Sequence, residues 1–168
     1  NFFIADNKWH QITVVFCRKS NIFIYVDGMF DTSADISHWG NVNMQSNNPF
    51  KIGSYTESDN SSPCHLFNGL IDNVSIWNKA LTQEEIQYYM NRKLDGDEEN
   101  LVGYWTLDEG EGGIAHDLTA NQNHGTIYNA EWTEGEVDLR LYLPEPIDNI
   151  LYNTNQKSVG DTILINWG

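Results

Sequence analysis

The chain of 168 residues has few cations, few cysteines and no long apolar run. Nine Lys and Arg stand against 24 Asp and Glu, which gives a formal net charge of −15. This excess repels phosphate backbones and anionic lipid, so nucleic acid and membrane surfaces are poor partners, whereas a cation or a neutral ligand fits. Because no run of about 18 apolar residues occurs, membrane insertion is not expected either.

Only two cysteines occur, Cys17 and Cys64. They form one disulfide if their strands end side by side, and are otherwise two buried free thiols, so they do not indicate a compartment. Aromatic residues are plentiful, with six Trp, eight Tyr and seven Phe, and such a density is typical of β-sheets and of sugar-binding surfaces. The chain begins without Met, and we interpret it as a fragment of a longer protein.

Alternating apolar residues and turn signals predict an antiparallel arrangement. Residues 9–17 and 22–26 read as strands, and the second ends at Asp27-Gly28, the dipeptide of tight hairpin turns, before a short strand over 29–32. On the first strand, apolar groups dominate the face of His10, Ile12, Val14 and Phe16. Further strands are predicted over residues 50–55, 65–77, 101–107 and 126–128.

One helix is predicted over residues 83–92. Thr82 can cap its N-terminus, and Glu85 lies three residues later, as a capping box requires. Residues 33–48 read as a long surface loop that carries His38 and Trp39. The Pro-Glu-Pro at residues 144–146 reads as part of a linker, which divides the chain into a β-sandwich domain over 1–140, a linker over 141–147 and the start of a second β-domain over 148–168.

Several of these segments, taken in order, resemble laminin-G-like domains of the concanavalin A-like lectin kind. The matching segments are WHQITVV at 9–15 with IYVDG at 24–28, FNGLIDNVSIWN at 67–78 with the helix after it, and LVGYWTLDEGEG at 101–112. The resemblance implies an all-β fold, an antiparallel β-sandwich (jelly roll) with one short helix. The tail from residue 146 resembles the first strands of an immunoglobulin-like or fibronectin type III module.

The strands that open such domains, before the Trp-His segment, have no counterpart in this chain. An incomplete sandwich leaves unpaired strand edges and apolar faces, which favour strand exchange. We therefore expect a homo-oligomer.

The resemblance also raises a catalytic alternative, because related β-glucanases carry carboxylates at alternating positions of one strand. Glu134, Glu136 and Asp138 follow that alternation, but Arg140 stands where a further acid would follow. The segment also directly precedes the Pro-rich linker, where a solvated acidic edge strand is the simpler interpretation. We do not expect an enzyme.

Two kinds of binding site are predicted. His38, Trp39 and Tyr55 could form an aromatic platform for a sugar ring, the alternative being a Trp packed against the sandwich. Calcium, which prefers several oxygen ligands and is common in laminin-G-like domains, is the candidate cofactor. Its candidate ligands, which ordinary turn chemistry explains as well, are Asp59, Asn60, Asp108, Asp117 and Asn121.

The sequence thus predicts a non-catalytic recognition or adhesion module of a larger secreted or cell-surface protein. Its expected partner is a glycan or an extracellular protein, bound through loops at one rim. A ligand-free structural spacer and a β-glucan hydrolase fragment are the alternatives.

Overall fold

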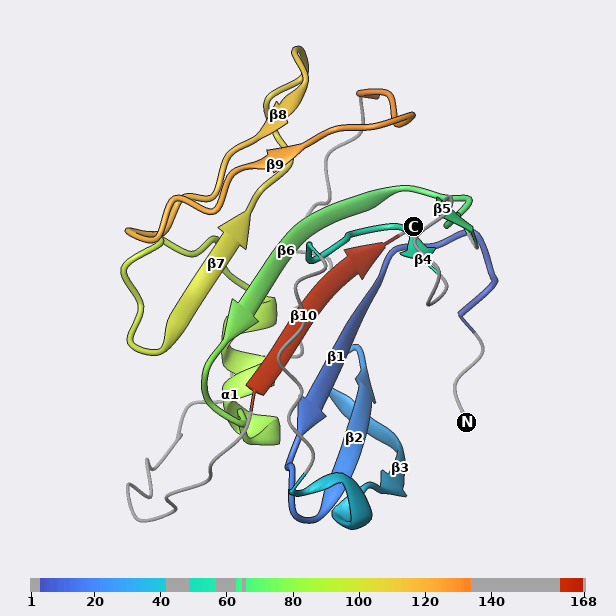
Figure 1. Cartoon of the computed structure of the whole chain (residues 1–168), viewed down its shortest axis with the longest axis vertical. Helices are drawn as coiled ribbons and strands as arrows, with labels where there is room; N and C mark the ends of the chain where they lie inside the picture. The colour runs from blue at the N-terminus through green and yellow to red at the C-terminus, as the bar shows by residue number, and fades with distance from the viewer. Residues whose placement is uncertain (1–3, 42–48, 57–62, 65, 134–160, 168) are drawn as a thin grey trace.

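A computed structural model describes residues 4–41, 49–56, 63–64, 66–133 and 161–167. Its centre is a six-stranded sheet with the order β3-β2-β1-β10-β6-β7, in which every neighbouring pair is antiparallel (Figure 1). Two small ladders, β4-β5 and β8-β9, accompany it. The predicted fold class, antiparallel β-sheets with one short helix, is confirmed. The sheet strands are β1 (His10–Phe16), β2 (Asn21–Val26), β3 (Met29–Asp35), β6 (Ile71–Trp77), β7 (Leu101–Trp105) and β10 (Asp161–Trp167).

The predicted hairpin turn joins β2 to β3. Asp27 and Gly28 have φ values of +51° and +71°, the left-handed pair that matches the twist of the flanking strands. Gly28 is required for a second reason, because a Cβ at this position would lie 2.7 Å from Met90 Sδ. The turn therefore packs directly against the helix.

Helix α1 (Gln83–Met90) begins with the predicted capping box. The Glu85 backbone N–H donates to Thr82 Oγ1, and the Thr82 backbone N–H donates to the Glu85 carboxylate at 2.9 Å. The helix ends two residues earlier than predicted, because Asn91 leaves the helical region with φ −101° and ψ 18°.

Two apolar clusters cover opposite faces of the sheet, since neighbouring residues of a strand point to opposite sides. Trp77 and Tyr104 belong to the cluster that includes Ile86 of α1, while Val74 and Trp105 belong to the other. Trp77 is 0% and Trp105 6% exposed, so both tryptophans belong to the core.

Several predicted strands differ in extent from the observed ones, and β3 continues three residues beyond its predicted end at residue 32. The segment 50–55 contributes only β4 (Tyr55–Thr56), which pairs with β5 (Pro63–Cys64), because Gly53 adopts φ +74° and interrupts the extended backbone. The segment 65–77 becomes a strand at Ile71. In place of a strand over 126–128, β9 (Gly125–Thr126) pairs with β8 (Ile114–Ala115) beyond the end of β7 (Figure 1).

Strand β10 (Asp161–Trp167) comes from the part of the chain that is predicted to start a second β-domain. It pairs with β1 on one side and with β6 on the other, within the six-stranded sheet. Residues 141–160, which include the predicted linker, lie outside the described residues, so the boundary itself stays a prediction.

Two smaller findings concern the helix and the cysteines. Of the helices among the described residues, none has the length and apolar character needed to cross a membrane. Cys17 has a free thiol, and burial raises its pKa.

Candidate binding site

The predicted aromatic platform lies just after β3. A single 3₁₀ turn, η1 (Ser37–Trp39), follows that strand. The Ser37 backbone N–H donates to the Asp35 carboxylate at 2.8 Å, and the Ile36 N–H donates to the Ser20 carbonyl at 2.8 Å. These bonds fix the turn to the β1–β2 connection.

The structure brings His38 and Trp39 together. Their rings are 4.9 Å apart between centroids and inclined by 65°, an edge-to-face contact that orients the indole. Trp39 is 53% exposed, so about half of its surface is accessible to a ligand. A Cβ on Gly40 would come within 3.0 Å of the Arg18 carbonyl, which shows how closely the end of η1 approaches the β1–β2 turn.

Tyr55, the third predicted member of the platform, lies in β4, where its backbone pairs with Cys64. Its side chain is outside the described part of the structure. The contact between Tyr55 and the other two aromatic residues therefore stays a prediction.

Among the predicted calcium ligands that the structure describes, Asp117 is the most deeply buried, with 3% exposure. Its Oδ1 accepts the backbone N–H groups of Tyr104 at 3.0 Å and Thr119 at 2.9 Å, and its Oδ2 accepts that of Asn123 at 2.8 Å. Burial alone would raise the pKa of Asp117, but these backbone donors lower it below its ordinary value. The carboxylate thus joins β7 to the turn that follows β8.

Asn121 and His124 take part in the same turn. Asn121 Nδ2 donates to the Val102 carbonyl at 3.0 Å, and the Asp117 backbone N–H donates to His124 Nδ1 at 3.1 Å. Because His124 Nδ1 accepts a hydrogen bond, its proton is on Nε2 in the neutral ring. Asp117 and Asn121 both hold this turn against β7, the role that ordinary turn chemistry predicts.

Asp108, the remaining described candidate, is exposed and lies 3.4 Å from Lys93 Nζ through its Oδ2. Burial and, secondly, the negative charge of Asp108 raise the pKa of Asp72 to about 6, because both make the ionised form of Asp72 less favourable. Within the described ranges, no group of three or more His, Cys, Asp or Glu could hold a metal ion. Asp59 and Asn60 lie outside those ranges, and calcium binding stays a prediction.

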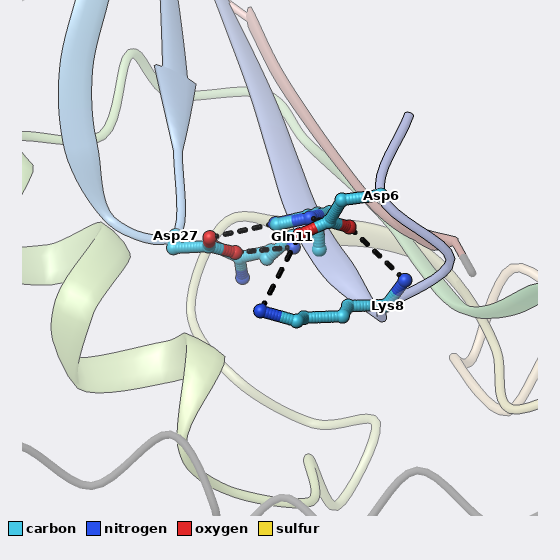
Figure 2. A network of polar contacts seen from close by, with 5 residues as sticks. Asp6, Lys8, Gln11 and Asp27 are labelled. Atoms are coloured by element: carbon cyan, nitrogen blue, oxygen red, sulfur yellow. Dashed lines mark hydrogen bonds and ion pairs between the residues drawn. The ribbon is translucent and has the colours of Figure 1, made fainter. Parts of the chain in front are cut away.

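Sequence reasoning missed a second polar site, centred on His10. His10 Nδ1 lies 2.8 Å from Asp27 Oδ2, and its Nε2 lies 2.9 Å from Asp6 Oδ1. Asp27 Oδ1 also accepts the Gln11 backbone N–H at 2.9 Å, and Lys8 lies beside Asp6 (Figure 2). Burial opposes the charge on the ring, but the two hydrogen bonds and the carboxylate charges outweigh it, so the pKa of His10 is raised.

Comparisons with known proteins bear on the fold of this site. The family model described as the concanavalin A-like lectin/glucanases superfamily, of the laminin-G kind, matches residues 3–87, just over half of the chain. The match covers the hairpin, η1, β6 and most of α1. No curated protein and no solved structure matches.

Proposed function

The chain belongs to the laminin-G-like family of the concanavalin A-like lectin/glucanase superfamily, and from this premise we propose that it is a non-catalytic recognition module that binds carbohydrate through the turn carrying His38 and Trp39. The family supports binding of carbohydrate or protein in general. The choice of carbohydrate and of this turn is our inference from the exposed aromatic pair.

The observation that carries the proposal is the half-exposed Trp39 on a turn whose N-terminal end is fixed by hydrogen bonds of Ile36 and Ser37. An indole face matches the apolar face of a pyranose ring, and a preoriented ring loses little conformational entropy on binding. The net charge of −15 disfavours sulfated or phosphorylated sugars. We therefore expect a neutral glycan as the ligand.

The test is binding to a panel of neutral and acidic glycans, followed by titration of each ligand that binds. Trp39→Ala should weaken binding by about 30-fold, which corresponds to the roughly 2 kcal/mol that a central tryptophan contributes at an interface. Tyr128→Ala is the matched control, because Tyr128 is an aromatic residue with 81% exposure outside the proposed site. Equal affinities for the two variants would contradict the assignment of the site.

If no glycan binds the unmutated chain, the spacer alternative gains support. Hydrolysis of β-glucan by the unmutated chain, abolished in Glu136→Gln, would instead favour the glucanase alternative. Glu134, Glu136 and Asp138 lie outside the described residues, and we expect no hydrolysis.

The wider context of the module is part of the same proposal. Laminin-G-like domains are commonly extracellular, which supports a place in a larger secreted or cell-surface protein. A calcium requirement is checked by thermal melting in calcium and in chelator. A calcium-dependent rise in melting temperature that Asp59→Asn or Asp108→Asn abolishes would support the predicted ligands.

A further inference from the structure

Strand β10 occupies an unusual place, because it completes the sheet between two strands that lie far before it in the sequence. Its residues pair with all seven positions of β1, from His10↔Trp167 to Phe16↔Asp161, and with five of β6, from Thr162↔Trp77 to Trp167↔Ile71. Figure 1 shows β10 in red between β1 and β6. Since both neighbours are antiparallel to β10, β1 and β6 run parallel to each other.

Without β10, β1 and β6 would face each other across a slot one strand wide, about 10 Å between their axes. Each would present a row of unpaired N–H and C=O groups to the slot, which is a template for an added strand. The two edges cannot simply close on each other, because the rest of the fold holds them in place.

Contacts outside β10 also join the two sides of the slot. Val15 of β1 packs in the same core cluster as Trp77 of β6 and Ile86 of α1. On the β1 side, the hairpin turn is tied to the helix, since Gln87 Nε2 donates to the Gly28 carbonyl at 3.1 Å. The body of the domain is therefore a preformed acceptor for one antiparallel strand.

The donor strand is connected to this body by a long stretch of sequence. Residues 134–160, 27 in number, separate β10 from the last described residue before it. A strand supplied by another molecule can compete with the chain's own β10 when the protein concentration is high. Reciprocal exchange keeps every β1–β10 and β10–β6 pair, because the pairs are the same within a chain and between chains.

We propose that the slot between β1 and β6 is a strand-exchange interface, in which a second copy of this chain contributes its β10 and receives the first copy's β10 in return. The partner is a copy of the chain because the strand that fits the slot in this register is its own. The net charge of −15 on each copy opposes association, so exchange should increase with salt. The interface is independent of the proposed glycan site.

The test uses full-length chains in which Cys17 and Cys64 are replaced by Ser. One chain carries Val14→Cys, and the other carries Ile163→Cys and a mass tag; these residues are direct partners in the β1–β10 register. Neither chain can form this disulfide alone. After incubation of the mixture at high concentration in moderate salt, exchange predicts a disulfide-linked heterodimer on a non-reducing gel.

The matched control replaces Ile163→Cys with Thr162→Cys. Thr162 pairs with Val15, not with Val14, so this mixture should give at least tenfold less heterodimer. Phe16→Cys with Asp161→Cys, a partner pair at the end of the strands, serves if circular dichroism shows that the first pair does not fold. In the unmutated chain, light scattering should show a dimer whose fraction rises with concentration and with salt.

Two results would overturn the proposal. The first is a monomer at every concentration and salt level in the unmutated chain. The second is a dimer in which the double variant Val14→Cys, Ile163→Cys links only within one chain and the mixed single variants give no heterodimer. That second result would mean that the copies meet through another surface.

Discussion

Replacement of His10 should destabilise the protein in a pH-dependent way. Both ring nitrogens lie within hydrogen-bonding distance of carboxylates, at 2.8 Å and 2.9 Å. Only the imidazolium form can donate from both nitrogens at once, so this geometry selects the charged ring. The ring is well shielded, with 12% of the side chain exposed. His10→Gln removes the charge and one of the two donors.

The size of the expected loss of stability is set by the hydrogen bond between His10 and Asp27. A hydrogen bond between charged groups contributes about 1.5–3 kcal/mol, but Asp27 is 32% exposed and solvent screens the pair. We therefore expect a loss of about 1 kcal/mol, which lowers the melting temperature of a domain of this size by roughly 2–4 °C. The contact matters because it joins the β2–β3 turn to β1.

The pH range in which His10 stabilises the protein is set by the shifted pKa values of His10 and Asp6. The folded pKa of His10 is raised above its ordinary 6.5, so its contribution is complete below that value and is lost as pH rises through the folded pKa. The hydrogen bond from His10 lowers the pKa of Asp6, whose contribution is present above its ordinary 3.8 and is lost as pH falls through the lowered value. Between these limits the charged ring of His10 lies between the carboxylates of Asp6 and Asp27.

The assay is thermal unfolding of the wild type and of His10→Gln at pH 6 and pH 8.5. The difference in melting temperature should be largest at pH 6 and should shrink at pH 8.5. His116→Gln is the control, since His116 is 53% exposed and meets a single carboxylate, that of Glu109, at 3.2 Å. A His10→Gln difference that is the same at both pH values would refute the reasoning.

Three further substitutions test other parts of the fold through the melting temperature. Thr82→Ala removes the helix cap and should cost about 1 kcal/mol, whereas Thr82→Ser should cost much less. Asp72→Asn should stabilise the protein by about 1 kcal/mol at pH 8, because the folded pKa of Asp72, raised to about 6, makes its ionised form unfavourable in the folded state and solvent screens part of this effect. The gain should vanish at pH 4, where the folded protein already holds the protonated carboxyl group. Asp117→Ala leaves three backbone N–H groups without their acceptor and should cost roughly 3 kcal/mol, and an equal loss with and without calcium would support the structural role of Asp117.

The features that could be predicted from the sequence are local in the chain. The Asp27-Gly28 turn and the Thr82 capping box each depend on residues no more than three apart, and both occur where predicted. The exposure of Trp39 also agrees with its place in a polar loop. Such features need only the backbone preferences of a few neighbouring residues.

The features that were missed join residues far apart. His10 and Asp27 are 17 positions apart, and no spacing rule links a strand histidine to a turn carboxylate across a hairpin. The insertion of β10 joins residue 161 to residue 16. A strand-like stretch near the end of a chain predicts a strand but not its partner, because the alternation of apolar residues within one strand does not say which sheet edge it joins. The Pro-rich segment at residues 144–146 indicated a domain boundary before this strand, so its pairing with β1 and β6 was not predicted.

Strand β1 shows that the alternation of apolar residues does not identify the more deeply buried face of a strand. Its apolar face, with Ile12, Val14 and Phe16, was the natural candidate for burial, yet Val14 and Phe16 are only partly buried. The opposite face is buried more deeply, with Gln11 at 5%, Thr13 at 0% and Val15 at 3% exposure, because Val15 on that face shares a core cluster with α1. Thr13 Oγ1 donates to Gln11 Oε1 at 3.4 Å, so the two polar side chains partly satisfy each other there. Where both faces of a sheet are covered, the more deeply buried face of a strand depends on the element that packs against it. Here that element is helix α1, which begins 67 residues after the end of β1.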